Sequence, residues 1–158
     1  MRERPTVRVL LIGPDGRILL VRFLDPRLNR GRVFWATVGG EREPGESIEA
    51  GARRETFEET GLTDIALGPV VWTDDPIIRI GDEKVQFRET YVVAHTEGGA
   101  LSRAGFTEEE KAAVTDLRWW TVDEIRGSSE QIYPEVLADW LPDILAARYP
   151  DPPRRIVR

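Results

Sequence analysis

The chain has 158 residues, which favours a single domain, and its 41% hydrophobic and 32% charged residues are typical of a globular protein. The net charge of −6 argues against non-specific binding to a nucleic-acid backbone, and no apolar run approaches the ~20 residues of a membrane helix. The absence of cysteine excludes disulfides, thiolate metal sites and a cysteine nucleophile, and a cytoplasmic location is the default expectation.

The first half of the chain is predicted to form strands followed by a helix. The segment "TVRVLLIGPDGRILLVRF" indicates a hairpin with its turn at Gly13-Pro14-Asp15-Gly16, and a short strand is expected at Val33–Val38. A helix is predicted over Ser47–Thr60, because Ser47 is a favoured N-cap and Gly61 stands where helices commonly end in a left-handed glycine.

The second half mixes strands with short helices. Strands are predicted for "IALGPVVWT", "PIIRI", "KVQFRETYVVAH" and "DLRWW". Two helix starts are indicated by capping-box spacing, at Thr107 with Glu110 and at Thr121 with Glu124. The segment "YPEVLADWLPDILAA" predicts a closing helix that Pro142 kinks or splits.

The order of these elements predicts the fold class. Strands joined by hairpins, with helices interspersed without regular alternation, indicate an α+β protein with a mixed sheet. The domain is expected to cover residues 1–148. Residues 149–158 are rich in proline and arginine, and poor order is expected there.

Three glutamates crowd the predicted helix that follows the glycine pair. At 100° per residue, Glu55, Glu58 and Glu59 fall within about 100° of arc, so they share one face. Clustered carboxylate oxygens suit Mg²⁺, Mn²⁺ or Ca²⁺. The alternative is a solvated acidic face that pairs with Arg53 and Arg54, and the helical wheel alone does not separate the two.

The spacing of the segment 39–62 resembles a known family motif. It fits the pattern G-x5-E-x7-R-E-U-x-E-E-x-G-U, in which U is aliphatic, with Gly40, Glu46, Arg54, Glu55, Glu58, Glu59, Gly61 and Leu62 at the fixed positions. This is similar to the Nudix box of the Nudix (MutT-like) hydrolases. Thr56 departs from the aliphatic position and Val38 replaces a frequent proline, but neither change removes a ligand.

The resemblance implies a divalent-metal site in the acidic segment. In the family, the glutamates matching Glu58 and Glu59 hold the cation, and the one matching Glu55 joins directly or through water, acting as the base in some members. A carbonyl of the glycine pair, here Gly39, often completes the site. The implied cofactor is Mg²⁺, for which Mn²⁺ can substitute.

Further roles follow from the same resemblance. Arg54 and Glu46 match residues that orient the ligands by tying the loop to the helix. Arg22 matches a position where relatives often carry a phosphate-contacting arginine, with a surface salt bridge as the alternative. Trp35 immediately precedes the box and is expected to stack on a base, whereas core packing is expected for most other aromatic residues.

The resemblance also implies one more glutamate at the metal, because the family often recruits one from outside the box. Glu89 is favoured, because a charge on the same strand face as Phe87 and Tyr91 is unusual unless that face lines the site. The alternative is Glu108–Glu110, whose simpler role is to cap a helix and complement its dipole.

The resemblance implies an α/β/α sandwich and a pyrophosphohydrolase that cleaves a nucleoside diphosphate linked to another moiety by water attack on phosphorus. Nucleoside triphosphates, oxidised deoxynucleoside triphosphates, ADP-ribose, dinucleoside polyphosphates and nucleotide sugars all stay open as substrates. A nucleotide is the expected partner, nucleic acid and membrane are not, and a homodimer stays open. The alternative is a catalytically silent nucleotide-sensing or binding module. An isopentenyl-diphosphate-isomerase-like activity is disfavoured, because that chemistry uses a cysteine.

Overall fold

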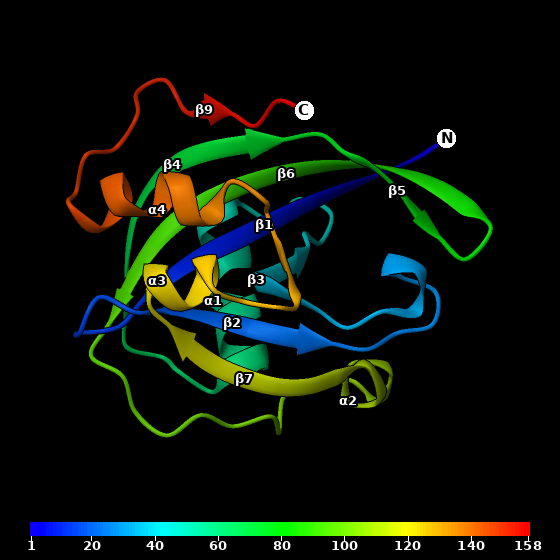
Figure 1. The fold of residues 1–158 in the computed structure, drawn as a ribbon, viewed down its shortest axis with the longest axis horizontal. Coiled ribbons are helices and arrows are strands. Elements are labelled where there is room, and N and C mark those ends of the chain that lie inside the picture. Colours follow the sequence, from blue (N-terminus) through cyan, green and yellow to red (C-terminus); the bar gives the residue numbers. More distant parts are fainter.

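A nine-stranded mixed β-sheet forms the centre of the computed structural model, which describes residues 1–158 (Figure 1). The main path of the sheet runs β7-β2-β3-β1-β6-β4-β9, while β5 pairs with β6 and β8 pairs with β3. The strands are β1 (Arg2–Ile12), β2 (Ile18–Phe23), β3 (Phe34–Glu41), β4 (Ile65–Asp74), β5 (Ile77–Ile80), β6 (Glu83–Thr96), β7 (Val114–Trp120), β8 (Gln131–Tyr133) and β9 (Arg154–Arg155).

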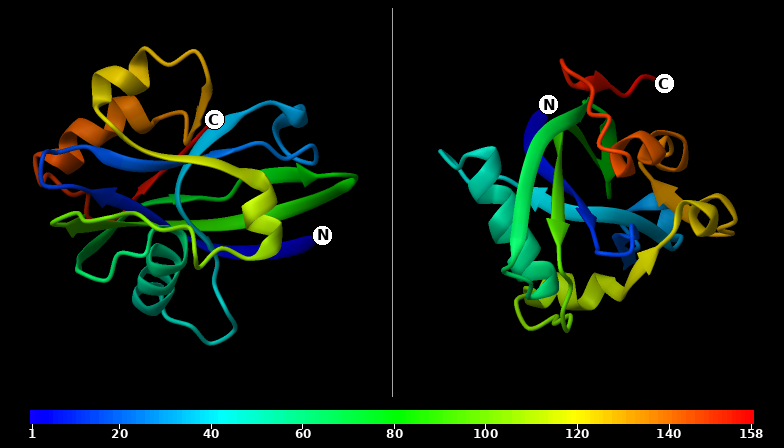
Figure 2. Two further views of the ribbon diagram at one scale, coloured as in Figure 1. Left: turned by 90° about the horizontal axis from the view of Figure 1, so that it is seen from below. Right: turned by 90° about the vertical axis from the view of Figure 1, so that its left-hand side faces the viewer.

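Helices lie on both sides of this sheet. They are α1 (Ile48–Thr60), α2 (Glu108–Ala113), α3 (Val122–Arg126) and α4 (Leu137–Leu145), with a short 3-10 turn at Asn29–Gly31. Figure 2 shows α1 on one side of the sheet and α3 with α4 on the other. The expected α/β/α sandwich around a mixed sheet is therefore confirmed. None of these helices is both long enough and apolar enough to cross a bilayer.

Strand β1 supplies side chains to the cores on both faces of the sheet. Because side chains alternate along a strand, Val7 and Val9 pack in the core beneath α1, while Leu10 and Ile12 pack in the core beneath α3 and α4. In the first half of β1, the residues on the same face as Leu10 and Ile12 are polar. The face opposite α1 is therefore apolar at one end of the strand and polar at the other.

The local signals for helix ends are confirmed. The Ser47 side chain accepts a hydrogen bond from the Ala50 amide, and Gly61 closes α1 in the left-handed conformation with φ of 78°. Both predicted capping boxes form, at Thr107 before α2 and at Thr121 before α3. These ends are set by residues a few positions apart, which explains why the sequence alone identifies them.

Helix α4 runs through Pro142 without being split. Proline lacks the amide hydrogen that would bond the Ala138 carbonyl one turn earlier. The Arg126 Nη2 atom donates to that carbonyl instead, at 3.2 Å. A side chain from α3 thus satisfies the acceptor that Pro142 leaves free. Of the kink or split expected at Pro142, the split does not occur.

The C-terminal segment 149–158, for which the sequence predicts poor order, is docked on the sheet. Strand β9 pairs in parallel with β4, and Ile156 is buried in the core beneath α4. The Arg154 guanidinium lies 3.7 Å from the centroid of the Trp140 ring. Proline and arginine content favours exposure, but here Ile156 and the guanidinium group of Arg154 contact residues far away in the sequence.

Removing the last ion pair of this segment is expected to loosen it. Arg158 binds Asp74 through two hydrogen bonds of 2.8 Å, and the Asp74 side chain is only 1% exposed. Arg158→Ala would leave this carboxylate buried without its cation, and should lower the free energy of unfolding by about 1–2 kcal/mol. Arg155→Ala is the matched control, because its partner Asp75 is one-third exposed and less than about 1 kcal/mol should be lost. Equal losses in urea unfolding would contradict this.

Candidate active site

Two glycines let the end of β3 lie close to β1 on one side and to helix α1 on the other. Gly39 has φ of +143°, and a Cβ atom there would lie 2.1 Å from the Val7 carbonyl oxygen. At Gly40 a Cβ would lie 2.8 Å from Oε1 of Glu55. Gly39 thus lets β3 lie this close to β1, and Gly40 lets it lie this close to the acidic helix, because neither position carries a side chain.

Gly39→Ala is expected to abolish stable folding. The new methyl group would overlap backbone atoms of β1, which cannot move without breaking the sheet, and the positive φ adds strain. Gly45→Ala is the control, because Gly45 also has positive φ, at +76°, but no atom lies within 4 Å of the place its methyl group would take. It should cost about 1 kcal/mol. Similar thermal midpoints for the two variants would show that the overlap at Gly39 is relieved at little cost.

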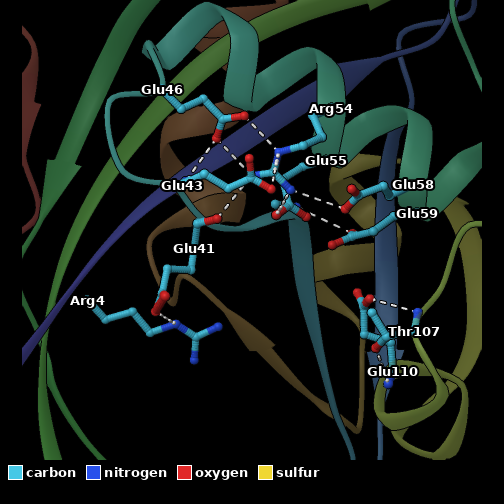
Figure 3. Close-up of polar contacts among 11 residues, drawn as sticks. Arg4, Glu41, Glu43, Glu46, Arg54, Glu55, Glu58, Glu59, Thr107 and Glu110 are labelled. Atoms are coloured by element: carbon cyan, nitrogen blue, oxygen red, sulfur yellow. Dashed lines mark hydrogen bonds and ion pairs between the residues drawn. The ribbon is translucent and has the colours of Figure 1, made fainter.

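Arg54 is the centre of the polar network on α1 (Figure 3). Its Nε and Nη2 atoms donate to the two carboxylate oxygens of Glu46 at 2.7 and 2.8 Å. Its Nη1 atom donates to Glu55 at 3.0 Å and to Glu58 at 3.2 Å, and Nη2 also donates to the backbone carbonyl of Glu41 at 3.1 Å. The arginine thus joins the loop to the helix and fixes three carboxylates.

Glu46 is held in its charged form by this arrangement. The hydrogen bonds from Arg54 lower the pKa of its carboxyl group to about 2, and the backbone amide of Glu43 donates a further bond of 3.0 Å. Glu46 thus ties its loop to Arg54 on α1.

Glu55 and Glu59 are buried, with 6% and 3% of their surface exposed. Nearby positive charges and hydrogen bonds do not fully offset the cost of burying these carboxylates. Burial raises the pKa of Glu59 well above its ordinary value, and the charge of Glu55 raises it further, against the opposing effects of Arg8 and the Gly39 amide. Burial also raises the pKa of Glu55. Buried carboxylates that resist ionisation are those that an added cation stabilises most, so the donor set fits a hard divalent ion.

The side chains are held apart in this arrangement. No three acidic side chains are close enough to form a ready ligand cluster. Glu55 and Glu58 both accept hydrogen bonds from Arg54, whereas Glu59 contacts the Gly39 amide at 3.4 Å.

The additional glutamates differ in where they lie. The charge of Glu110 raises the pKa of both Glu55 and Glu59, and Figure 3 shows Glu110 with Thr107 at the end of the cluster near Glu58 and Glu59. Glu110 also caps α2, so it keeps the capping role expected from the sequence.

Glu89, the favoured residue, is bound elsewhere. It accepts a hydrogen bond of 2.8 Å from Arg8 Nε and one of 3.2 Å from Thr6, on the face of β1 opposite the valines that pack under α1. Glu89 and the carboxylates of α1 form no group of acidic side chains ready to hold an ion, although the charge of Arg8, the partner of Glu89, also acts on Glu59. An ion pair with the neighbouring strand thus explains this acidic residue inside a strand.

Arg22 and Trp35 meet at a residue that the sequence analysis missed. Arg22 binds Glu130 through two hydrogen bonds of 3.1 and 2.7 Å, and Trp35 Nε1 donates to the same carboxylate at 2.9 Å. Trp35 is 3% exposed and packs edge-on against Trp120 in the core. No local pattern marks Glu130, because it is 108 positions from Arg22.

The mixed sheet between helices and the acidic segment 39–62 are the fold and the motif that the resemblance to the Nudix hydrolases implies. Comparisons with known proteins give the same family. A family model described as NUDIX domain matches residues 2–142. The chain belongs to the NUDIX family.

Individual relatives cover less of the chain. Nucleoside triphosphatase NudI of Salmonella heidelberg (strain SL476) is 45% identical over 83 residues, which is 51% of this chain and 55% of that protein. RNA pyrophosphohydrolase of Caulobacter vibrioides (strain NA1000 / CB15N) is 40% identical over 67 residues, covering 42% of this chain and 37% of that protein. The matches thus span about half or less of the length of these curated relatives.

A solved structure supports the fold. The MutT protein from Methanosarcina mazei Go1 aligns with a TM-score of 0.62 at 22% identity, covering 92% of this chain and 94% of that chain. At this identity the likeness concerns the fold alone.

Proposed function

We propose that the protein is a divalent-metal-dependent pyrophosphohydrolase that cleaves a nucleoside diphosphate linked to another moiety by attack of water on phosphorus. The observation that carries the proposal is the pair of buried, under-compensated carboxylates Glu55 and Glu59 beside the glycine pair. A structural acidic helix would place its charges in solvent or pair them fully. These two are instead withdrawn from water and turned toward the end of β3.

The residues have separate proposed roles. Glu58 and Glu59, with Glu55 and the Gly39 carbonyl, would hold Mg²⁺ or Mn²⁺, and Glu110 is the nearer of the additional acidic groups. When bound, the ion would neutralise phosphate charge and lower the pKa of a bound water. Arg54 orients Glu55 and Glu58 by its hydrogen bonds, and exchange of those bonds would let the carboxylates turn to the ion.

The substrate class is proposed as nucleoside triphosphates, including oxidised deoxynucleoside triphosphates. Support comes from the names of the relatives, a nucleoside triphosphatase and an RNA pyrophosphohydrolase. The net charge of −6 favours small nucleotides over long nucleic acids. We also propose a cytoplasmic location, where such nucleotides occur.

A substrate panel tests the proposal. Nucleoside triphosphates, an oxidised deoxynucleoside triphosphate, ADP-ribose, a dinucleoside polyphosphate and a nucleotide sugar would be incubated with Mg²⁺ or Mn²⁺, with detection of phosphate and pyrophosphate. Release of a nucleoside monophosphate that EDTA abolishes is expected. Tight nucleotide binding without turnover across the panel would show that the protein is a nucleotide-binding or sensing module and not an enzyme.

A further inference from the structure

The arginines around the site differ in how completely carboxylates satisfy them. Arg54 binds three glutamates through the hydrogen bonds that join the loop to α1. Arg22 forms a two-bond pair with Glu130, and the Nε atom of Arg8 binds Glu89 at 2.8 Å. Each of these guanidinium groups is already held by at least one hydrogen bond to a carboxylate.

Arg4 is held less completely than these three. Its single ion pair joins Nε to Oε1 of Glu41 at 3.1 Å, yet Nε is buried without a hydrogen bond of acceptable geometry. The guanidinium carbon lies 5.2 Å from the centroid of the Phe87 ring, which supports one side of the group. The side chain remains 30% exposed, so a ligand can reach it.

The charges around Arg4 leave it short of negative partners. Burial and the positive charge of Arg8 lower its pKa, and Arg2 adds to this, whereas Glu41 and Glu55 act in the opposite direction. Glu41 is half-exposed, and an ion pair with such a partner is weakened by the surrounding water. Glu41 can therefore leave Arg4 at little cost.

Arg4 also lies next to the acidic cluster. The backbone carbonyl of Glu41 accepts a hydrogen bond from Arg54, while the side chain of the same residue contacts Arg4. Figure 3 shows Arg4 below Glu41, beyond the network that Arg54 organises. One residue thus separates this cation from the carboxylates proposed to hold the metal.

We propose that Arg4 binds a phosphate oxygen of the substrate, exchanging Glu41 for it. The planar guanidinium group matches two phosphate oxygens at once, and a phosphate dianion is a stronger partner than one half-exposed carboxylate. Phe87 keeps the group in position before the ligand arrives. This inference rests on the proposed function, because it assigns a contact to the substrate of that site.

The test is calorimetric titration of inorganic pyrophosphate with Mg²⁺ into the wild type and four variants. Arg4→Gln removes the charge, Arg4→Lys keeps the charge without the planar fork, and Glu41→Gln releases Arg4 from its partner. The matched control is Arg2→Gln, because Arg2 lies on the same strand but pairs only with the exposed Glu83. Thermal melts would accompany each titration.

The proposal predicts that Arg4→Gln raises the dissociation constant about tenfold or more, which corresponds to about 1.4 kcal/mol per factor of ten. Arg4→Lys should restore part of the affinity, Glu41→Gln should tighten binding, and Arg2→Gln should change it less than about twofold. If a nucleotide is turned over, Arg4→Gln should raise KM more than it lowers kcat.

Unchanged affinity in Arg4→Gln, or failure of the wild type to bind pyrophosphate, would overturn the assignment of Arg4. If Arg4→Gln does not fold, Glu41→Gln serves as the test instead. An unchanged affinity of Glu41→Gln for pyrophosphate would then contradict the proposal. If Arg4→Gln loses pyrophosphate binding but the wild type turns over no nucleotide, the assignment of Arg4 as a phosphate-binding residue stands and the proposed hydrolase function is wrong.

Discussion

Glu59→Gln is expected to lower kcat by about a hundredfold or more, equivalent to about 2.7 kcal/mol of barrier at 1.36 kcal/mol per factor of ten. The variant keeps the shape of the side chain and its contact with the Gly39 amide, but loses the charge proposed to hold the cation. In EDTA its melting temperature should equal or exceed that of the wild type, because a neutral amide carries no cost of ionisation in the buried site beside Glu55. The assay is kcat against Mg²⁺ concentration beside a thermal melt.

The pH dependence of stability provides a separate test on the metal-free protein. In the folded state the pKa of Glu59 lies well above the ordinary value of 4.5, so the folded protein holds a proton that the unfolded chain releases. Below the ordinary pKa of 4.5 the stability from this group is fully present, and it is lost as pH rises from there toward the raised pKa of the folded state, so Glu59→Gln should flatten that loss. Glu49→Gln, on the exposed face of the same helix, is the control. Full activity of Glu59→Gln at ordinary Mg²⁺ would remove Glu59 from the metal site.

Arg54→Ala is expected to reduce both stability and activity. Glu46, Glu55 and Glu58 would lose their shared cation, which should lower the free energy of unfolding by about 2–4 kcal/mol in the metal-free protein. Activity should fall by about 10–100-fold, as is usual when a residue that orients metal ligands is lost. Urea unfolding and steady-state kinetics measure the two effects.

The stability of the protein at acid pH reports on the contribution of Glu46 to the Arg54 network separately from the contributions of the other two carboxylates. Arg54 holds the folded-state pKa of Glu46 at about 2, below its ordinary value of 4.5. The stability from this pair is present above pH 4.5 and is lost as pH falls toward 2, so Arg54→Ala should lack this acid-dependent loss. Arg53→Ala is the matched control, because the neighbouring Arg53 has a 3.6 Å contact with the exposed Glu49. A larger loss in Arg53→Ala would contradict the central role of Arg54.

The parts of the fold that the sequence predicts are those set by nearby residues. Ser47 and Gly61 bound α1, and the capping boxes at Thr107 and Thr121 start α2 and α3, because in each case the interacting groups lie within four positions. The acidic face of α1 was predictable for the same reason, since helical periodicity alone places its glutamates together.

The parts that the sequence did not predict depend on residues far apart in the chain. Glu130 joins Arg22 and Trp35 across about 100 positions, and β9 docks on β4 across about 80. Strand parity identified Glu89 as unusual, but the same parity places Arg8 beside it on β1. An isolated pattern could not show whether metal or arginine neutralises that charge.

The pairing of β1 with β6 bears on how the chain folds as it is made. Eleven consecutive residue pairs join these strands, from Arg2 with Val85 to Ile12 with His95, each 83 positions apart. At a synthesis rate of about 5–20 residues per second, β1 waits about 4–17 s for its parallel partner. During that interval β1 can pair only with β2 and β3, and its other edge is open to strands of neighbouring chains. The arginines at positions 2, 4 and 8 place charge on this waiting strand, which disfavours aggregation of the nascent protein.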